Sequence, residues 1–209
     1  MHIPDGFLDT KTWVTTTAAG ACALGYALNK SKLELSRKQV PTIALVGSFI
    51  FAAQMINFPI AGATSGHFLG GTLASILFGP AVGIIIMAAV LIIQAFFFQD
   101  GGITVLGANI LCTGVIGSLA GYGMYRLGMG AIGGKFRFAV TFISAWFSLV
   151  LAAASVSLLL IWSGYPAGSV FTAMVGWHSI IGIGEGAITA MVAAYLVERK
   201  ITIPSEVTA

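Results

Sequence analysis

Residues 80–98 read PAVGIIIMAAVLIIQAFFF, a stretch without a single charged side chain. A helix needs about 20 predominantly apolar residues to cross the hydrocarbon core of a bilayer. This stretch therefore predicts a membrane-spanning helix. Comparable apolar runs lie at 13–28, 40–57, 103–125, 138–162 and 171–197, and a shorter one lies at 67–79.

The composition of the whole chain gives the same result. Hydrophobic residues make up 57%, charged residues only 8%, and the mean hydropathy is +0.97, whereas about a quarter of the residues of a soluble domain are charged. The basic residues sit in short loops and form no continuous face, which excludes a nucleic-acid partner. The chain is an integral membrane protein with lipid around it.

The loop charges predict how the chain crosses the membrane. If the short run at 67–79 spans, the basic loops at 29–39 and 126–137 and the basic tail all fall on one side. The positive-inside rule then places the N-terminus outside and the C-terminus in the cytoplasm. We expect an all-α, multi-pass bundle of about seven transmembrane helices, forming a single domain over residues 1–209 in a prokaryotic plasma membrane.

The N-terminus, MHIPDGFLDTKTW, lacks the basic region followed directly by an apolar stretch that marks a secretory signal. A bulky second residue also disfavours removal of the initiator methionine, so Met1 is expected to keep a free α-amine. We expect residues 1–12 to form an external segment that chelates a metal ion.

The chelating groups are three nitrogens at the start of the chain. The α-amine of Met1, the deprotonated amide nitrogen of His2 and Nδ1 of its ring can close a five-membered and then a six-membered ring on one cation. His67, expected at the same external face, would supply a fourth nitrogen. Planar nitrogen coordination is typical of Ni(II) or Cu(II), whereas zinc prefers a tetrahedron and calcium prefers oxygen ligands. Proline and Asp-Gly in the following IPDG predict a tight turn that orients these residues.

Each of these residues also has an ordinary interpretation. A histidine at position two is by itself weak support for a metal site, and His67 could be an interfacial histidine bonded to a loop carbonyl. His178 and Glu185 lie seven residues apart on one helix face, where they could form a structural network, support the site or mark an exit route. The structural network is the interpretation we favour. Further polar residues in apolar runs, expected to satisfy one another, are Gln54, Asn57, Gln94, Gln99, Asp100 and Asn109.

Four ordered blocks carry a resemblance to a known family. They are MHIPDGFL at 1–8, FAAQMINFPIAGATSGHFLGG at 51–71, QAFFFQDGGITVLGANIL at 94–111 and HSIIGIGEGAITA at 178–190. Together they resemble the CbiM/NikM family, the substrate-specific membrane subunits of energy-coupling-factor nickel and cobalt transporters. The resemblance implies high-affinity capture of Ni²⁺ or Co²⁺ at the external face, with Met1, His2 and His67 as the metal-binding residues, and no intrinsic cofactor.

The resemblance also implies partners. They are a transmembrane coupling subunit, two ATP-binding cassette subunits and, in some systems, a small accessory membrane subunit. Small residues at four-residue spacing, Ala19, Ala23 and Ala27, are similar to faces that contact the coupling subunit, although spacing alone favours packing within the chain, as it does for Gly117 and Gly121. The stretch MGAIGGKF at 129–136 departs from a P-loop at both ends, so we expect a transporter subunit that is not an enzyme.

Other functions remain open on the sequence. Ser65 beside His67, with His178 as a base, would suggest an intramembrane serine hydrolase, but the GxSxG spacing is lacking. A passive channel would need rings of polar residues. A subunit for another small substrate, such as a vitamin, would need an aromatic or hydrogen-bonding pocket and leaves the MH start unexplained. For the metal site, the reference histidine pKa predicts that affinity falls steeply below about pH 6.5.

Overall fold

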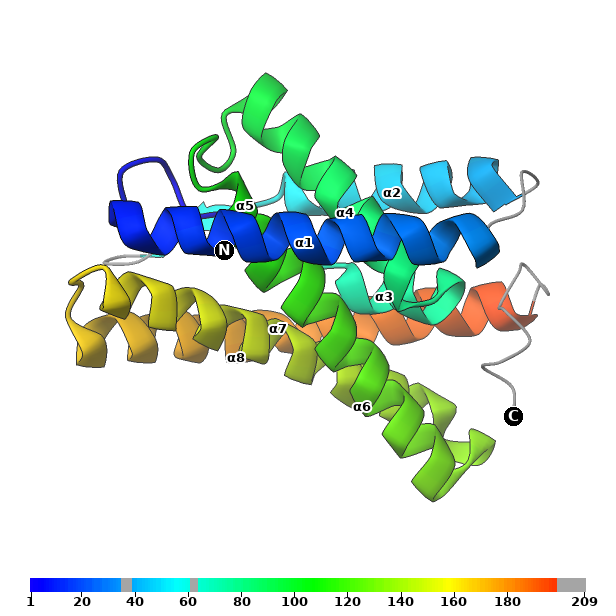
Figure 1. The fold of residues 1–209 in the computed structure, drawn as a ribbon. Coiled ribbons are helices and arrows are strands. Elements are labelled where there is room, and N and C mark those ends of the chain that lie inside the picture. Colours follow the sequence, from blue (N-terminus) through cyan, green and yellow to red (C-terminus); the bar gives the residue numbers. More distant parts are fainter. Residues whose placement is uncertain (35–38, 61–63, 199–209) are drawn as a thin grey trace.

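The computed structural model describes residues 1–34, 39–60 and 64–198 and shows a helical bundle (Figure 1). Its helices are α1 (Thr10–Glu34), α2 (Val40–Gln54), α3 (Gly71–Phe78), α4 (Pro80–Ile93), η2 (Gln94–Phe98), α5 (Leu106–Asn109), η3 (Ile110–Ile116), α6 (Gly117–Ile132), η4 (Gly134–Phe136), α7 (Arg137–Trp162) and α8 (Ala167–Glu198). Two short strands, β1 (Phe58–Pro59) and β2 (Ser65–Gly66), pair antiparallel between α2 and α3. The predicted all-α class is confirmed.

Four helical stretches are long and apolar enough to cross a membrane, among the residues that the structure describes. They are Pro80–Phe98, Leu106–Ile132, Gly134–Trp162 and Ala167–Leu196. The first joins α4 to the π-helical η2, and the second joins α5, η3 and α6. These stretches coincide with four of the predicted apolar runs, and α2 is a shorter apolar helix.

The short run at 67–79 differs from the sequence expectation. Only Gly71–Phe78 is helical, and eight residues at 1.5 Å each extend about 12 Å, less than half of the hydrocarbon core. Gly79, with φ of 84°, ends α3, and Pro80 starts α4 directly. The structure therefore does not confirm seven full-length crossings, and the orientation of the termini stays a prediction.

Helices α1, α2, α7 and α8 run along the long direction of the molecule, whereas α4 and α6 cross it obliquely (Figure 1). The start of α1 and the end of α8 lie at opposite ends of the bundle, and α7 and α8 form a long antiparallel pair. The central helix α3 is completely buried. Of the basic loops that predict the topology, the side chains of 32–38 and the tail at 199–209 lie outside the described residues.

Small residues on two helices serve packing within the chain. A Cβ on Gly121 of α6 would lie 1.9 Å from Thr72 Oγ1 of α3, so only glycine allows this approach. On α1, Ala27 is fully buried in a cluster with residues of α4, and Ala23 packs against the same cluster. The prediction that a partner docks on the face of Ala19, Ala23 and Ala27 is therefore wrong for Ala27, because α4 already covers it. Ala19 on the same helix is exposed.

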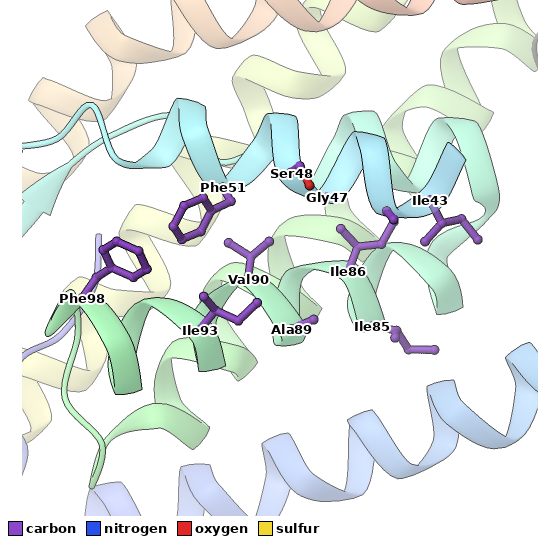
Figure 2. Close-up of a pocket in the computed structure, with 11 residues that line it drawn as sticks. Ile43, Gly47, Ser48, Phe51, Ile85, Ile86, Ala89, Val90, Ile93 and Phe98 are labelled. Atoms are coloured by element: carbon purple, nitrogen blue, oxygen red, sulfur yellow. The ribbon is translucent and has the colours of Figure 1, made fainter. Parts of the chain in front are cut away.

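An apolar groove of about 520 Å³ separates α2 from α4 (Figure 2). Phe51 and Phe98 stand at one end, Ile43 and Ile85 at the other, and the Ser48 hydroxyl is the one polar side-chain group of the lining. The groove holds no titratable side chain, so it offers nothing to bind a metal ion.

Candidate metal centre

The first residues turn back into the bundle. The Phe7 N–H donates to Pro4 O at 3.4 Å, and Gly6 has φ of 83°, which confirms the predicted turn. Helix α1 begins at Thr10, three residues earlier than the predicted apolar run, because the Asp9 carboxylate accepts the Thr12 N–H at 2.8 Å and caps the helix. The loop therefore covers residues 1–9, and its Met1 is fully buried.

Residue Ile3 fixes this loop to the segment 100–109. Its N–H donates to Asn109 Oδ1 at 2.8 Å, and Asn109 Nδ2 donates back to Ile3 O at 3.1 Å. The Gly102 N–H donates to the same carbonyl at 2.9 Å. A Cβ on Gly102 would lie 2.4 Å from Asp5 N, so only glycine lets the two backbones approach this closely. The position of the chain's first nitrogens is thus set by residues about a hundred positions away.

The structure brings the three predicted metal-binding residues together. The Met1 amine donates to the Ser65 carbonyl and, at 2.9 Å, to Ser65 Oγ, which also accepts the His2 N–H at 3.3 Å. The rings of His2 and His67 have centroids 4.2 Å apart with an interplanar angle of 40°. Both residues are almost fully buried, at 2% and 1% exposure.

Hydrogen bonds at Nδ1 fix the tautomers of both rings. His67 Nδ1 lies 2.6 Å from Phe68 O, and His2 Nδ1 lies 2.9 Å from Asp100 Oδ1. Because these oxygens only accept, we assign the proton of each neutral ring to Nδ1. The Nε2 atoms of both rings are buried and have no hydrogen-bond partner within the described chain.

This arrangement has a different consequence for each ring. The sequence analysis also allowed His67 to be a histidine that bonds to a loop carbonyl, and this bond is present. It leaves the lone pair of His67 Nε2 free to bind a metal ion. For His2, the chelate needs Nδ1, which Asp100 holds in the absence of an ion. Loading an ion by that mode therefore requires the bond between His2 and Asp100 to be exchanged.

Burial favours neutral nitrogens at this site. It lowers the pKa of the Met1 amine well below its ordinary value, against the attraction of Asp100. Burial also lowers the pKa of His67 well below 6.5, with additional repulsion from the amine and from His2. The pKa of His2 is lowered by burial, although the hydrogen bond to Asp100 opposes this. Partial burial acts to raise the pKa of Asp100, but the hydrogen bond and attraction of His2, the N-terminal amine and the bond from Asn57 together outweigh it, and the net pKa is lowered.

A pocket of about 580 Å³ reaches His2 from the surface. Its lining contains His2, Pro4, Asp5, Asn57, Pro59, Thr64, Ser65, Ala95, Gln99, Asp100, Gly101, Gly102 and Ile103. Oxygen atoms of Asp5 and Asp100 can attract a hydrated cation here. Of the two kinds of pocket that another small substrate would need, this one is not aromatic, since no Phe, Tyr or Trp ring lines it, although its polar side chains could form hydrogen bonds.

The buried side chains of Glu185, Gln54 and His178 bond to backbone groups. Glu185 accepts the N–H groups of Leu69 and Gly70 at 2.7 and 2.9 Å, and Gln54 donates to Leu69 O at 2.6 Å. His178 is fully buried, and its Nδ1 lies 2.7 Å from Met174 O. The favoured network of side chains bonding to one another is therefore present only in part, as between Asn57 and Asp100 at 2.9 Å.

Sequence reasoning missed three residues that shape the site, Ser65, Asp100 and Asn109. Asp100 and Asn109 stood out as polar residues in apolar runs, but their partners could not be read from spacing. No three His, Cys, Asp or Glu side chains gather to hold a metal ion in the described part of the chain. An ion here would need the backbone nitrogens of the N-terminus.

Comparisons with known proteins agree with the fold. Residues 2–203 match the family model of the cobalt uptake substrate-specific transmembrane region, CbiM. The chain belongs to this family. It is thus a multi-pass protein of a prokaryotic membrane, as the sequence predicts.

Similar proteins and solved structures are named for the transport of metal ions. A protein of Haloquadratum walsbyi assigned to metal transport is 41% identical over 96% of this chain and 91% of its own. The fused nickel transport protein NikMN of Rhodobacter capsulatus is 33% identical over 94% of this chain, which spans 61% of that protein. A crystal structure of a truncated transition metal transporter superposes with a TM-score of 0.90 at 32% identity, covering 95% of this chain and 99% of that one.

Proposed function

We propose that this family member captures a divalent transition-metal ion, Ni²⁺ or Co²⁺, with high affinity and serves its uptake as the substrate-specific subunit of an ATP-driven transporter. The ion is held by the Met1 amine, the amide nitrogen and Nδ1 of His2, and Nε2 of His67. One observation carries the proposal: the N-terminal amine is fully buried beside two histidine rings whose centroids are 4.2 Å apart.

Burying a charged amine without compensation is costly, so a buried N-terminus needs a reason. Binding an ion supplies one, because a neutral amine and two neutral imidazoles are metal ligands. The deprotonated amide of His2 and the carboxylate of Asp100 would each carry one negative charge, which together balance the charge of a divalent cation. Ser65 would release the amine and the amide to the ion.

The partners follow from the family. Its description as a substrate-specific region supports a separate coupling subunit and two ATP-binding cassette subunits, which this chain would need for energy. The relatives named for nickel transport and for cobalt transport support both ions as cargo. Planar nitrogen coordination favours Ni²⁺, while Cu²⁺ would bind still more tightly on intrinsic affinity.

The serine hydrolase alternative lacks its catalytic pair. In the described chain, the groups bonded to Ser65 Oγ are the Met1 amine and the His2 N–H, and no histidine ring nitrogen is bonded to it. A nucleophile needs a base within hydrogen-bond reach. The arrangement thus favours a binding site over a catalytic one.

The decisive experiment compares nickel binding by the purified protein with that of a variant carrying one extra residue before Met1. The extension keeps every side chain and displaces only the amine. We expect loss of binding in this variant and in His2→Ala and His67→Ala. Unimpaired binding by the extended protein would overturn the proposed site.

A further inference from the structure

The segment that carries His67 lies along one face of α8. Thr64 Oγ1 donates to Met174 Sδ at 3.5 Å, and a Cβ on Gly66 would lie 2.8 Å from the side chain of Ile181. The α8 residues in these contacts, Met174 and Ile181, lie on one helix face with Glu185, because the three are spaced seven and four residues apart.

Glu185 makes the strongest of these contacts. Its Oε2 accepts the Leu69 N–H at 2.7 Å, and its Oε1 accepts the Gly70 N–H at 2.9 Å. These amides precede α3, where no carbonyl of the same helix can accept from them. Residue Glu185 is 2% exposed, so bulk water does not replace it as an acceptor.

Gln54 of α2 holds the same segment from the other side. Its Nε2 donates to Leu69 O at 2.6 Å, so Leu69 is bonded through both its N–H and its carbonyl. Leu69 is two residues from His67, and the intervening Phe68 accepts the bond from His67 Nδ1. The orientation of the His67 ring is therefore linked to Glu185 through three consecutive residues.

The two halves of the metal centre are anchored separately. Met1 and His2 are fixed through Ile3 to Asn109 and Gly102, whereas His67 is fixed to α8 and α2. A metal site requires its ligands to be held within about 0.5 Å of the productive geometry. For the half that contains His67, the bonds to Glu185 of α8 and to Gln54 of α2 are the contacts that hold the segment in place.

We propose that Glu185 is a positioning residue of the metal centre, which holds His67 Nε2 at the distance where it closes the chelate of the N-terminus. This inference rests on the proposed function, because it concerns the same ion. Glu185 touches neither the ion nor its ligands directly. It acts through the Leu69 and Gly70 amides.

The test uses Glu185→Gln, which keeps the size of the side chain but leaves one of the two amides without an acceptor. We expect nickel affinity to fall by about 10–100-fold, the usual effect of losing a residue that orients a metal ligand. With Cu²⁺ as an optical probe, the d–d band should move toward that of His67→Ala, because the fourth nitrogen is displaced. A merely structural role would lower stability without moving this band.

Thr189→Val is the matched control. Thr189 lies one helical turn beyond Glu185, is equally buried and has no hydrogen-bond partner in the described chain. We expect wild-type affinity and a wild-type spectrum from this variant. Glu185→Asp, which keeps the carboxylate but shortens it by one methylene, should lie between Glu185→Gln and the wild type.

A wild-type spectrum and affinity in Glu185→Gln, while His67→Ala changes both, would overturn the inference and leave the proposed function standing. Failure of the wild-type protein to bind any ion would overturn both. If Glu185→Gln does not fold, Gln54→Leu releases the same segment from the opposite side. The same shift of the band is expected there, and its absence would contradict the role of this anchor.

Discussion

At the scale of single residues, the candidate metal centre depends on which atom of each group is free. The Nδ1 atoms of His2 and His67 are bonded to oxygens, and their Nε2 atoms have no partner in the described chain. The Met1 amine is buried against Ser65. The site thus holds the Met1 amine and the two free ring nitrogens close together in a buried position.

The lowered pKa values of Met1, His2 and His67 predict a shifted pH dependence. A base with a lowered pKa stays neutral to lower pH. Protons should therefore compete with the ion only below about pH 6.5, the pH that the reference histidine pKa predicts. We expect the affinity of the protein to fall at lower pH than that of a free peptide of residues 1–8. Nickel titrations of both across pH 4–8 measure this, and a fall at higher pH in the protein would contradict it.

Asp100 predicts a second effect at this scale. Its carboxylate leaves His2 Nδ1 when the ion binds there but keeps a negative charge beside the ion, so Asp100→Asn should weaken nickel binding by about 10–100-fold. The control is Asp9→Asn, because Asp9 is exposed and caps α1 away from the site. Competition with a chelator of known affinity measures both variants. Equal affinities would show that Asp100 has no part in binding.

At the scale of elements, glycines let separate segments meet at backbone distance. A Cβ on Gly107 of α5 would lie 2.3 Å from the Thr17 backbone of α1, and one on Gly20 would lie 2.6 Å from Gly107 O. Helix α1 therefore packs directly on α5. Because α5 carries Asn109, this contact places the N-terminal loop and its anchor in the same part of the bundle.

Gly102→Ala tests this close approach. The new Cβ would meet the Asp5 backbone nitrogen at 2.4 Å, so the N-terminal loop must shift, at a cost of about 1–3 kcal/mol in the free energy of unfolding. Nickel affinity should fall with it. Gly123→Ala in α6 is the control, since its Cβ meets nothing within 4 Å and the helix gains roughly 0.5–1 kcal/mol. Thermal unfolding in detergent and nickel titration distinguish the two, and an unchanged Gly102→Ala would contradict the packing.

At the scale of the whole molecule, the metal centre joins two parts of the bundle. The N-terminal loop is attached to the segment 100–109, and His67 is attached to α8 and α2. An ion bound by both halves would connect regions that otherwise meet at this point through hydrogen bonds to Ser65.

Binding of the ion should therefore stabilise the entire fold. A ligand that binds only the folded state at 100 times its Kd adds about 2.7 kcal/mol to stability. We expect Ni²⁺ to raise the thermal midpoint of the protein, and Mg²⁺, which prefers oxygen ligands, to leave it unchanged. The variant with one residue added before Met1 should show no rise with nickel. An equal rise in that variant would place the ion elsewhere.

The sequence by itself determined the all-α membrane class and most of the apolar helices, and it predicted Met1, His2 and His67 as the metal-binding residues. Both kinds of prediction follow from local properties of the chain. The length of an apolar run predicts a membrane-spanning helix, and two adjacent residues, Met1 and His2, form the chelate rings. The proximity of His67 to the N-terminus could be expected because both were assigned to one face of the membrane. The short length of α3 could not be expected from the sequence. Gly70 and Gly79 bound the helix within an apolar run that continues beyond it.

Only the tertiary structure decided which groups hold the site in place. Asp100 meets His2 across 98 positions, and Glu185 meets Leu69 across 116. Such contacts leave no period in the sequence, because they join a side chain to whichever backbone group the packing leaves unsatisfied. The sequence shows that polar side chains lie within the bundle. Only the fold determines which nitrogen each of them accepts a hydrogen bond from.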